Sequence, residues 1–186
     1  ECHVFPAALS KAFDSLEFWS QAMSWRALGM PESLTRMLMA IDQQGETEVI
    51  LGQGRTTADV LGDAGRYKSG RGVRQGSIGG PIKWIIYMNF WLKYVANKHQ
   101  GEGYIMSRRD DEGEKVEVLA QMFVDDSNWF SSNLRNHQRV IRSCEDFVEF
   151  HGLSFNKKKC EYIAINQDMR SEGRGWKRPK WRTGET

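Results

Sequence analysis

The feature that most constrains this chain is an alternating segment that runs directly into two adjacent aspartates. Between residues 116 and 124, apolar side chains occupy every second position. A period of two predicts a β-strand. Asp125 and Asp126 follow at once, and the short run 128–130 is able to pair back on the strand. We therefore predict a hairpin with both aspartates at its tip.

Two carboxylates at a hairpin tip form a candidate cation site. Neighbouring side chains on a flat strand point to opposite faces, whereas a tight turn directs both toward one point. A divalent cation there offsets their repulsion, and Mg²⁺ prefers such hard oxygen ligands together with water and substrate phosphates. The pattern predicts Mg²⁺ (or Mn²⁺) at Asp125 and Asp126. Taken alone, a polar turn without metal is the commoner occurrence of an Asp-Asp pair, and this alternative stays open.

Composition limits the class of protein. The 186 residues are 40% hydrophobic and include seven Trp, five Tyr and nine Phe, which excludes full-length disorder and predicts one domain with at most an appendage. The longest apolar stretch, 82–95, is interrupted by Lys83, Asn89 and Lys93. It is shorter than the ~20 residues of a membrane span, so we expect no membrane partner. Three cysteines without metal-ligand spacing predict a reducing, intracellular location, either cytoplasm or nucleus.

Apolar periodicity predicts alternating strands and helices. We expect strands at 4–9, 48–51, 66–68, 116–124, 128–130 and 161–165. Asp14 and Glu17 have the spacing of a capping box for a helix that ends near Gly29. Helices are also expected after Pro31, after Pro81 and after 131–133. The first has a core face of Leu34, Met37, Leu38 and Ile41, and the second is apolar over nearly its whole surface. The core face of the third consists of Val140, Ile141, Cys144, Phe147 and Val148. The fold class is α/β (α+β), with a small antiparallel sheet packed against helices.

Three further motifs hold residues suited to phosphate chemistry. Gly-Val-Arg-Gln-Gly at 72–76 precedes a helix, and such a segment offers backbone N–H groups and side-chain donors to an anion. Three lysines at 157–159 follow Gly-Leu-Ser-Phe-Asn at 152–156, and a lysine near a phosphate neutralises charge or donates a proton. Lys-Ala-Phe-Asp at 11–14 ends the first strand. Each motif alone is also an ordinary turn, a solvated lysine run or a helix cap.

In this order and spacing, the four motifs resemble the palm of reverse transcriptases, and the form of 72–76 is similar to the non-LTR retrotransposon branch. The resemblance covers about residues 4–165. It implies RNA-templated DNA synthesis with an RNA template, a DNA primer and deoxynucleotides. It implies that Asp125, Asp126 and the Leu9 carbonyl bind metal and that Lys159 assists the leaving pyrophosphate. It also implies a nucleotide site, with Phe13 as the steric gate beside Arg74, Gln75 and Gly76.

The chain departs from this family at its first catalytic aspartate. The position three residues before Lys11 is Ala8, and a methyl group cannot bind a metal. The two-metal reaction needs carboxylates that bridge ions ~4 Å apart. We therefore expect an inactive or severely impaired polymerase palm over 1–166, with the fingers and thumb missing. The alternative is a palm remnant that binds nucleic acid or protein without chemistry. A nucleotidyl cyclase is a third possibility, against which the motif at 72–76 argues.

The last twenty residues differ in composition from the rest. Segment 167–186 interleaves indole rings with cations, and such segments stack on single-stranded bases while they pair with phosphates. We expect a basic, disordered tail in which Lys177, Arg178, Lys180 and Trp181 contact nucleic acid. A degenerate end of the chain explains the same composition.

Overall fold

The computed structural model describes residues 1–48, 50–51, 54–55, 66–74, 76–107 and 115–166. The chain divides into two compact units. One is formed by Glu1–Ser10 together with Trp91–Thr186, and the other by Lys11–Phe90. Among the described segments, no helix has both the length and the apolar content needed to cross a bilayer.

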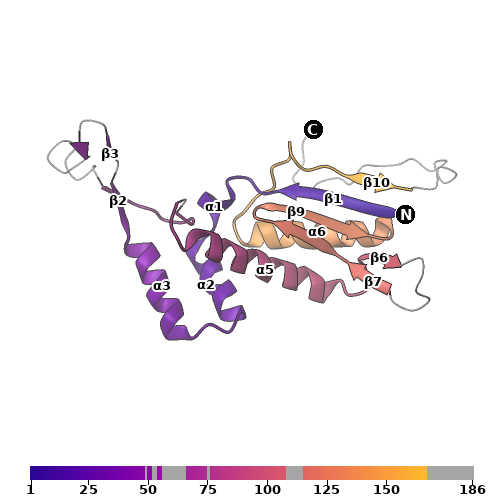
Figure 1. Ribbon diagram of the computed structural model, residues 1–186, viewed down its shortest axis with the longest axis horizontal. Coiled ribbons are helices and arrows are strands. Elements are labelled where there is room, and N and C mark those ends of the chain that lie inside the picture. Colours follow the sequence, from indigo (N-terminus) through magenta and orange to yellow (C-terminus); the bar gives the residue numbers. More distant parts are fainter. Residues whose placement is uncertain (49, 52–53, 56–65, 75, 108–114, 167–186) are drawn as a thin grey trace. The chain divides into compact units, whose positions relative to one another are not determined.

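A four-stranded antiparallel sheet forms the centre of the first unit (Figure 1). Its strands, in spatial order, are β10 (Ile163–Ile165), β1 (Cys2–Ala8), β9 (Asp126–Ser131) and β8 (Ala120–Phe123). All three neighbouring pairs are antiparallel. The predicted small antiparallel sheet backed by helices is therefore confirmed.

Helix α6 (Leu134–Phe150) covers one face of this sheet (Figure 1). Ser127, Trp129 and Ser131 of β9 point toward that face and are buried. The helix buries the five apolar residues that the sequence predicted for it, together with two polar ones, His137 and Ser143. The predicted cap is also present, because Asn133 Oδ1 accepts a hydrogen bond from the Asn136 N–H at 2.9 Å. The other face of the sheet carries Asp126.

Burial of His137 makes the stability of this unit depend on pH. Neither ring nitrogen has a hydrogen-bond partner among the described residues, and His3 and Tyr162 lie beside the ring, with ring centroids 5.9 and 5.5 Å away. Burial, and secondarily the neighbouring His3, lowers the pKa of His137 to about 4. Its pKa in the unfolded chain is about 6.5, so the unfolded state binds the proton first.

We therefore expect the free energy of unfolding to be constant above about pH 7 and to fall as the pH drops from about 6.5 to 4. The loss is on the order of 3 kcal/mol for this one group. Urea unfolding at pH 7, 5.5 and 4.5 measures it. His137→Gln should make the curve shallower but not flat, because burial also lowers the pKa of His151 to about 4. A native chain that is equally stable at pH 7 and pH 4.5 would show that His137 is not held neutral.

The C-terminal half of α5 (Gly80–Lys98) completes the core of this unit. Trp91 lies 5.3 Å from Trp129 and 6.0 Å from Phe147, measured between ring centroids. A hairpin of β6 (Tyr104–Ser107) and β7 (Lys115–Val118) follows the helix. The predicted single strand 116–124 is wrong: β7 pairs with β6, whereas β8 pairs with β9, and the chain changes partner at Leu119.

The second unit is mainly helical. Helices α1 (Ala12–Ser15), α2 (Phe18–Ala27) and α3 (Glu32–Gln44) precede two small ladders. In these ladders β2 (Glu46–Glu48) pairs with β5 (Arg66–Lys68), and β3 (Ile50–Leu51) pairs with β4 (Gly54–Arg55). Ala22, Trp25 and Met39 form its buried cluster.

Two predicted helix features in this unit are wrong. Asp14 lies inside α1 and caps nothing; Glu17 occupies the N-cap of α2, because Leu16 is extended and buried between the two helices. In α3, Leu34, Met37 and Ile41 are exposed, while Thr35 and Met39 are buried. The physical reason is the rotation of α3: Met39 packs on Trp25, and Asp42 pairs with Lys83 Nζ at 2.5 Å.

Exposure of α5 also differs from prediction. The helix is apolar nearly all round and was expected to be buried. Its described N-terminal half buries Trp84, Tyr87 and Met88 but leaves Ile82 and Ile85 more than half exposed.

Candidate active site at the β8–β9 turn

The two aspartates lie at a two-residue hairpin turn, as predicted. Phe123 pairs with Asp126, so only Val124 and Asp125 connect β8 to β9. Val124 has φ of 56°, a conformation that such turns usually give to glycine and that is a genuine outlier for a β-branched residue. Backbone strain of this kind concentrates at functional sites. The strained turn places a half-buried Asp125 next to an exposed Asp126.

Ala8 lies directly beside this turn. It is the last residue of β1, and its cross-strand partner in the antiparallel register is Asp126. Partners in an antiparallel pair lie on the same face with Cβ atoms about 5 Å apart. Ala8 is 5% exposed. A carboxylate at position 8 would therefore project from the same face as Asp126, whereas the methyl group offers no ligand.

The Leu9 carbonyl is directed toward the edge of β1 that pairs with β9. Leu9 forms an isolated antiparallel bridge with Phe155, and around it Asn156 N–H donates to the Ala8 carbonyl at 2.8 Å. Successive carbonyls along an extended chain point to opposite edges. The Ala8 carbonyl faces the 154–156 segment, so the Leu9 carbonyl faces the edge along which β9 and the turn run. The role of this carbonyl as a metal ligand stays a prediction.

The segment that contains Lys159 is docked onto the end of β1 by Asn156. Besides its bond to Ala8, Asn156 accepts at its carbonyl from the N–H groups of Lys159 (2.9 Å) and Cys160 (3.1 Å). Its Oδ1 accepts from the Lys158 N–H at 3.2 Å. Lys159 is exposed. The structure thus brings four predicted residues into the first unit around one strand end: Asp125, Asp126, Leu9 and Lys159.

Two other predicted motifs meet inside the second unit. Val73 N–H donates to the Phe13 carbonyl at 2.6 Å, and Gly72 N–H donates to the Leu16 carbonyl at 2.8 Å. The Phe13 ring stacks on Trp84 with centroids 4.9 Å apart. Gln21 Nε2 donates to the Gly72 carbonyl at 3.3 Å. Phe13, the candidate steric gate, is therefore held against the start of the 72–76 motif. Trp84 and Gln21 contribute to this contact, and the sequence motifs did not indicate either residue.

The remaining nucleotide-site candidates are only partly accounted for. The guanidinium group of Arg74 donates to the Gly45 carbonyl at the end of α3, which gives this arginine a structural contact beside its predicted role. Gly76 is exposed and has φ of 83°. Gln75 and the tail residues Lys177, Arg178, Lys180 and Trp181 lie outside the described residues.

The donor set suits Mg²⁺ but is one carboxylate short. Asp125 and Asp126 supply hard oxygen ligands, and water and phosphate oxygens ordinarily complete such a shell. Within the described ranges, no group of three or more His, Cys, Asp or Glu side chains is placed to hold a metal ion. Position 8, the cross-strand partner of Asp126, is an alanine and supplies no ligand.

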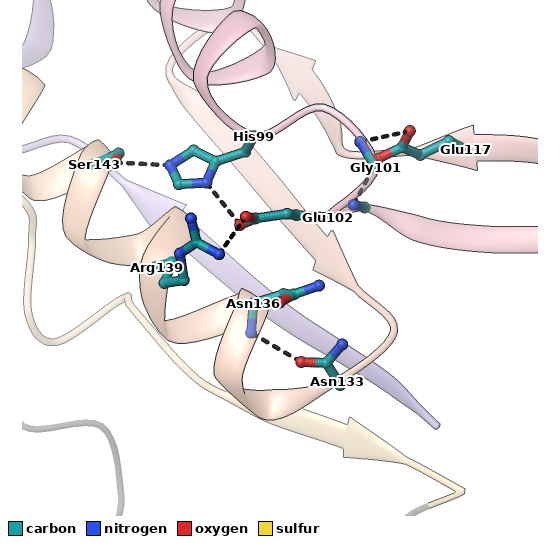
Figure 2. Close-up of polar contacts among 9 residues, drawn as sticks. His99, Gly101, Glu102, Glu117, Asn133, Asn136, Arg139 and Ser143 are labelled. Atoms are coloured by element: carbon teal, nitrogen blue, oxygen red, sulfur yellow. Dashed lines mark hydrogen bonds and ion pairs between the residues drawn. The ribbon is translucent and has the colours of Figure 1, made fainter.

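A polar cluster elsewhere in the first unit was missed by the motif search. His99 Nε2 lies 2.8 Å from Ser143 Oγ, and His99 Nδ1 lies 2.7 Å from the Glu102 carboxylate, which also accepts from Arg139 at 2.6 Å (Figure 2). This order of groups is that of a hydrolytic triad. Ser143 is 3% exposed on α6, so no substrate carbonyl reaches it. The cluster fixes the end of α5 to α6.

Comparison with known proteins identifies the family. The sequence model described as Reverse transcriptase (RNA-dependent DNA polymerase) matches residues 1–179. This chain belongs to the reverse transcriptase family. No curated protein matches the chain.

Solved structures show the same fold. The telomerase from Candida albicans, in complex with a TWJ fragment of telomeric RNA, is similar over 90% of this chain and 27% of its own, with 12% identity and a TM-score of 0.57. The apo telomerase from Candida tropicalis is similar over 89% of this chain and 29% of its own, with 11% identity and a TM-score of 0.61. The reverse transcriptase chain described here therefore spans less than a third of either telomerase chain.

Proposed function

We propose that this reverse transcriptase chain is a palm whose catalytic metal site lacks one carboxylate, and that its polymerase activity is consequently absent or severely impaired. The intact form of the site would extend a DNA primer on an RNA template with deoxynucleotides as substrates. The observation that carries this proposal is the register between β1 and β9. It pairs Ala8 with Asp126, next to a strained turn that holds Asp125.

In this proposal Asp125, Asp126 and the Leu9 carbonyl hold Mg²⁺. When bound, the metal supplies charge stabilisation and activates the primer hydroxyl. Phe13 would limit the sugar of the incoming nucleotide, and Arg74, Gln75 and Gly76 would contact that nucleotide. Lys159 donates a proton to, or neutralises, the leaving pyrophosphate.

The second candidate function is binding without chemistry. Ala8 favours it, because a site with two carboxylates can still bind a metal or a phosphate but lacks the bridge that the two-metal reaction needs. A palm of this kind would bind nucleic acid, or a protein, through the same strands. Binding that rests on phosphate contacts weakens steeply with salt and ignores sequence.

Two narrower assignments also belong to this proposal. The Gly-Val-Arg-Gln-Gly form of 72–76 supports an origin in a non-LTR retrotransposon. All three cysteines are free thiols, which supports a reducing location in the cytoplasm or nucleus.

RNA-templated primer extension by the Ala8→Asp variant tests the proposal against the binding-only alternative. Restored nucleotide incorporation shows that the rest of the palm is competent for synthesis and that the alanine at position 8 alone abolishes activity. Absence of incorporation from a folded variant favours binding without chemistry.

A further inference from the structure

The charges of α6 run against the dipole of the helix. Arg135 lies in its first turn, Arg139 and Arg142 follow, and Glu149 lies in its last turn. No acidic residue occurs in the first turn and no basic residue in the last. A helix is stabilised by the opposite order, with acids at its start and bases at its end. The order of charges therefore destabilises α6 slightly, so helix stability does not explain why the arginines are there.

The three arginines form one stripe on the outer face of the helix. Their spacing of four and three residues places them on the same side, and all three are exposed. The opposite side of α6 is buried against the sheet, as His137, Cys144 and Phe147 show. Arg139 is partly neutralised by Glu102 at 2.6 Å. Arg135 and Arg142 have no ion pair with any described residue and lie about 10 Å apart along the axis.

This arginine stripe is separate from the β8–β9 turn. Helix α6 packs on the sheet face that carries Trp129. Asp126 lies three positions before Trp129 on β9, so its side chain points to the opposite face. A strand of nucleic acid that reaches Asp126 therefore lies on the far side of the sheet from Arg135 and Arg142.

We propose that the stripe of Arg135, Arg139 and Arg142 is a second RNA-binding surface, on the back of the palm, which contacts the phosphates of a single strand. The planar guanidinium group has the donor geometry that phosphate oxygens accept in pairs. The same face of α6 continues into Asp146 and Glu149, so its cationic part is confined to residues 135–142. Within that part, a row of cations matches a row of phosphates along one strand, and this local charge complementarity favours a polyanion. A membrane surface fits less well, because the apolar residues of α6 are already used in the core.

The test is the salt dependence of binding to a single-stranded uridine oligonucleotide, measured by fluorescence anisotropy in EDTA, without primer or nucleotide. Each phosphate contact to a single strand contributes about 0.7 to the slope of log K against log[salt]. The double variant Arg135→Gln/Arg142→Gln is therefore expected to reduce the slope by about 1.4 and to bind more weakly at about 50 mM salt. Its melting temperature should stay the same or rise, because Arg135 opposes the helix dipole.

The matched control removes two exposed cations elsewhere in the same unit, with Lys93→Gln and Lys115→Gln. An equal loss of slope in both double variants would overturn the location on α6. Equal competition by poly-glutamate and by RNA would overturn the choice of RNA over an acidic protein. Because the measurement needs no metal and no catalysis, its failure leaves the proposed function untouched, and an inactive Ala8→Asp variant leaves this proposal untouched.

Discussion

Replacing Ala8 by aspartate is expected to raise the rate of RNA-templated primer extension on the order of a thousandfold, from a level near background. The reason is the geometry of the β1–β9 pair, in which position 8 lies beside Asp126 on the same face. In the proposed site, a carboxylate at position 8 would supply a third oxygen ligand beside Asp125 and Asp126. A thousandfold corresponds to about 4 kcal/mol of barrier, within the several kcal/mol that metal-held charge stabilisation supplies. Initial rates of primer extension with Mg²⁺ measure the gain.

Ala8→Asn is the matched control, because it has the size of aspartate and a neutral amide in place of the charge. We expect it to remain near background. Ala8→Asp combined with Asp125→Asn should also be inactive. If Ala8→Asn gains as much as Ala8→Asp, a ligand role for position 8 is excluded and the defect lies elsewhere.

Gly72→Ala is expected to destabilise the second unit by about 2–5 kcal/mol, the largest effect on stability that we predict. Gly72 has φ of 93°, which costs a residue with a Cβ about 1–2 kcal/mol, and the overpacking of a tight site costs about 1–3 more. A Cβ at Gly72 would lie 2.9 Å from the Asp14 carbonyl oxygen and 3.0 Å from the Phe13 carbonyl oxygen. Both neighbours are backbone, so neither moves cheaply. Urea unfolding measures the change.

Gly76→Ala separates the two causes. Gly76 also has a positive φ, of 83°, but a Cβ there meets no described atom within 4 Å. We expect it to lose only the conformational part, about 1–2 kcal/mol. Equal losses in the two variants would mean that the 72–76 motif is not held against Phe13 as the structure has it.

The aspartate hairpin was predictable because local signals agree there. Alternation over 116–124, the Asp125–Asp126 pair and the short run after it all indicate one turn, and the structure has the turn at the predicted place. The break at Leu119 was not predictable, since alternation continues across it without a turn residue. Only the partner strands distinguish β7 from β8, and β6, which pairs with β7, carries no strong alternation of its own.

The helices of the second unit show the limit of periodicity. The apolar stripe of Leu34, Met37 and Ile41 predicts a buried face for α3, but Asp42 and Met39 fix the helix in another rotation. The Asp14–Glu17 spacing likewise matches a capping box, while burial of Leu16 breaks the helix between the two residues. In both cases tertiary contacts between residues far apart in sequence overrode a local preference.

Sequence motifs were enough to name the candidate ligands, whereas the residues that hold these segments in place could not be predicted. Asp125, Asp126 and Ala8 could be named from motif spacing. Asn156, which joins the Lys159 segment to β1 through the Ala8 carbonyl, and Trp84, which stacks on Phe13, act through contacts that spacing does not encode. The cluster around His99 is similar: only the three-residue spacing of His99 and Glu102 hints at it, and Ser143 comes from a distant helix.

The most direct test of the central claim, that the turn at Asp125 and Asp126 binds a divalent metal, is the melting temperature of the chain as it stands with and without Mn²⁺. At a Mn²⁺ concentration about 100 times the dissociation constant, binding to the folded state adds about 2.7 kcal/mol, a rise of roughly 5–10 °C for a chain of this size. Asp125→Asn is expected to abolish the rise, whereas Glu149→Gln, which removes an exposed carboxylate from α6, should retain it. An equal rise in the Asp125→Asn variant would contradict the account and leave the two aspartates as residues of a polar turn.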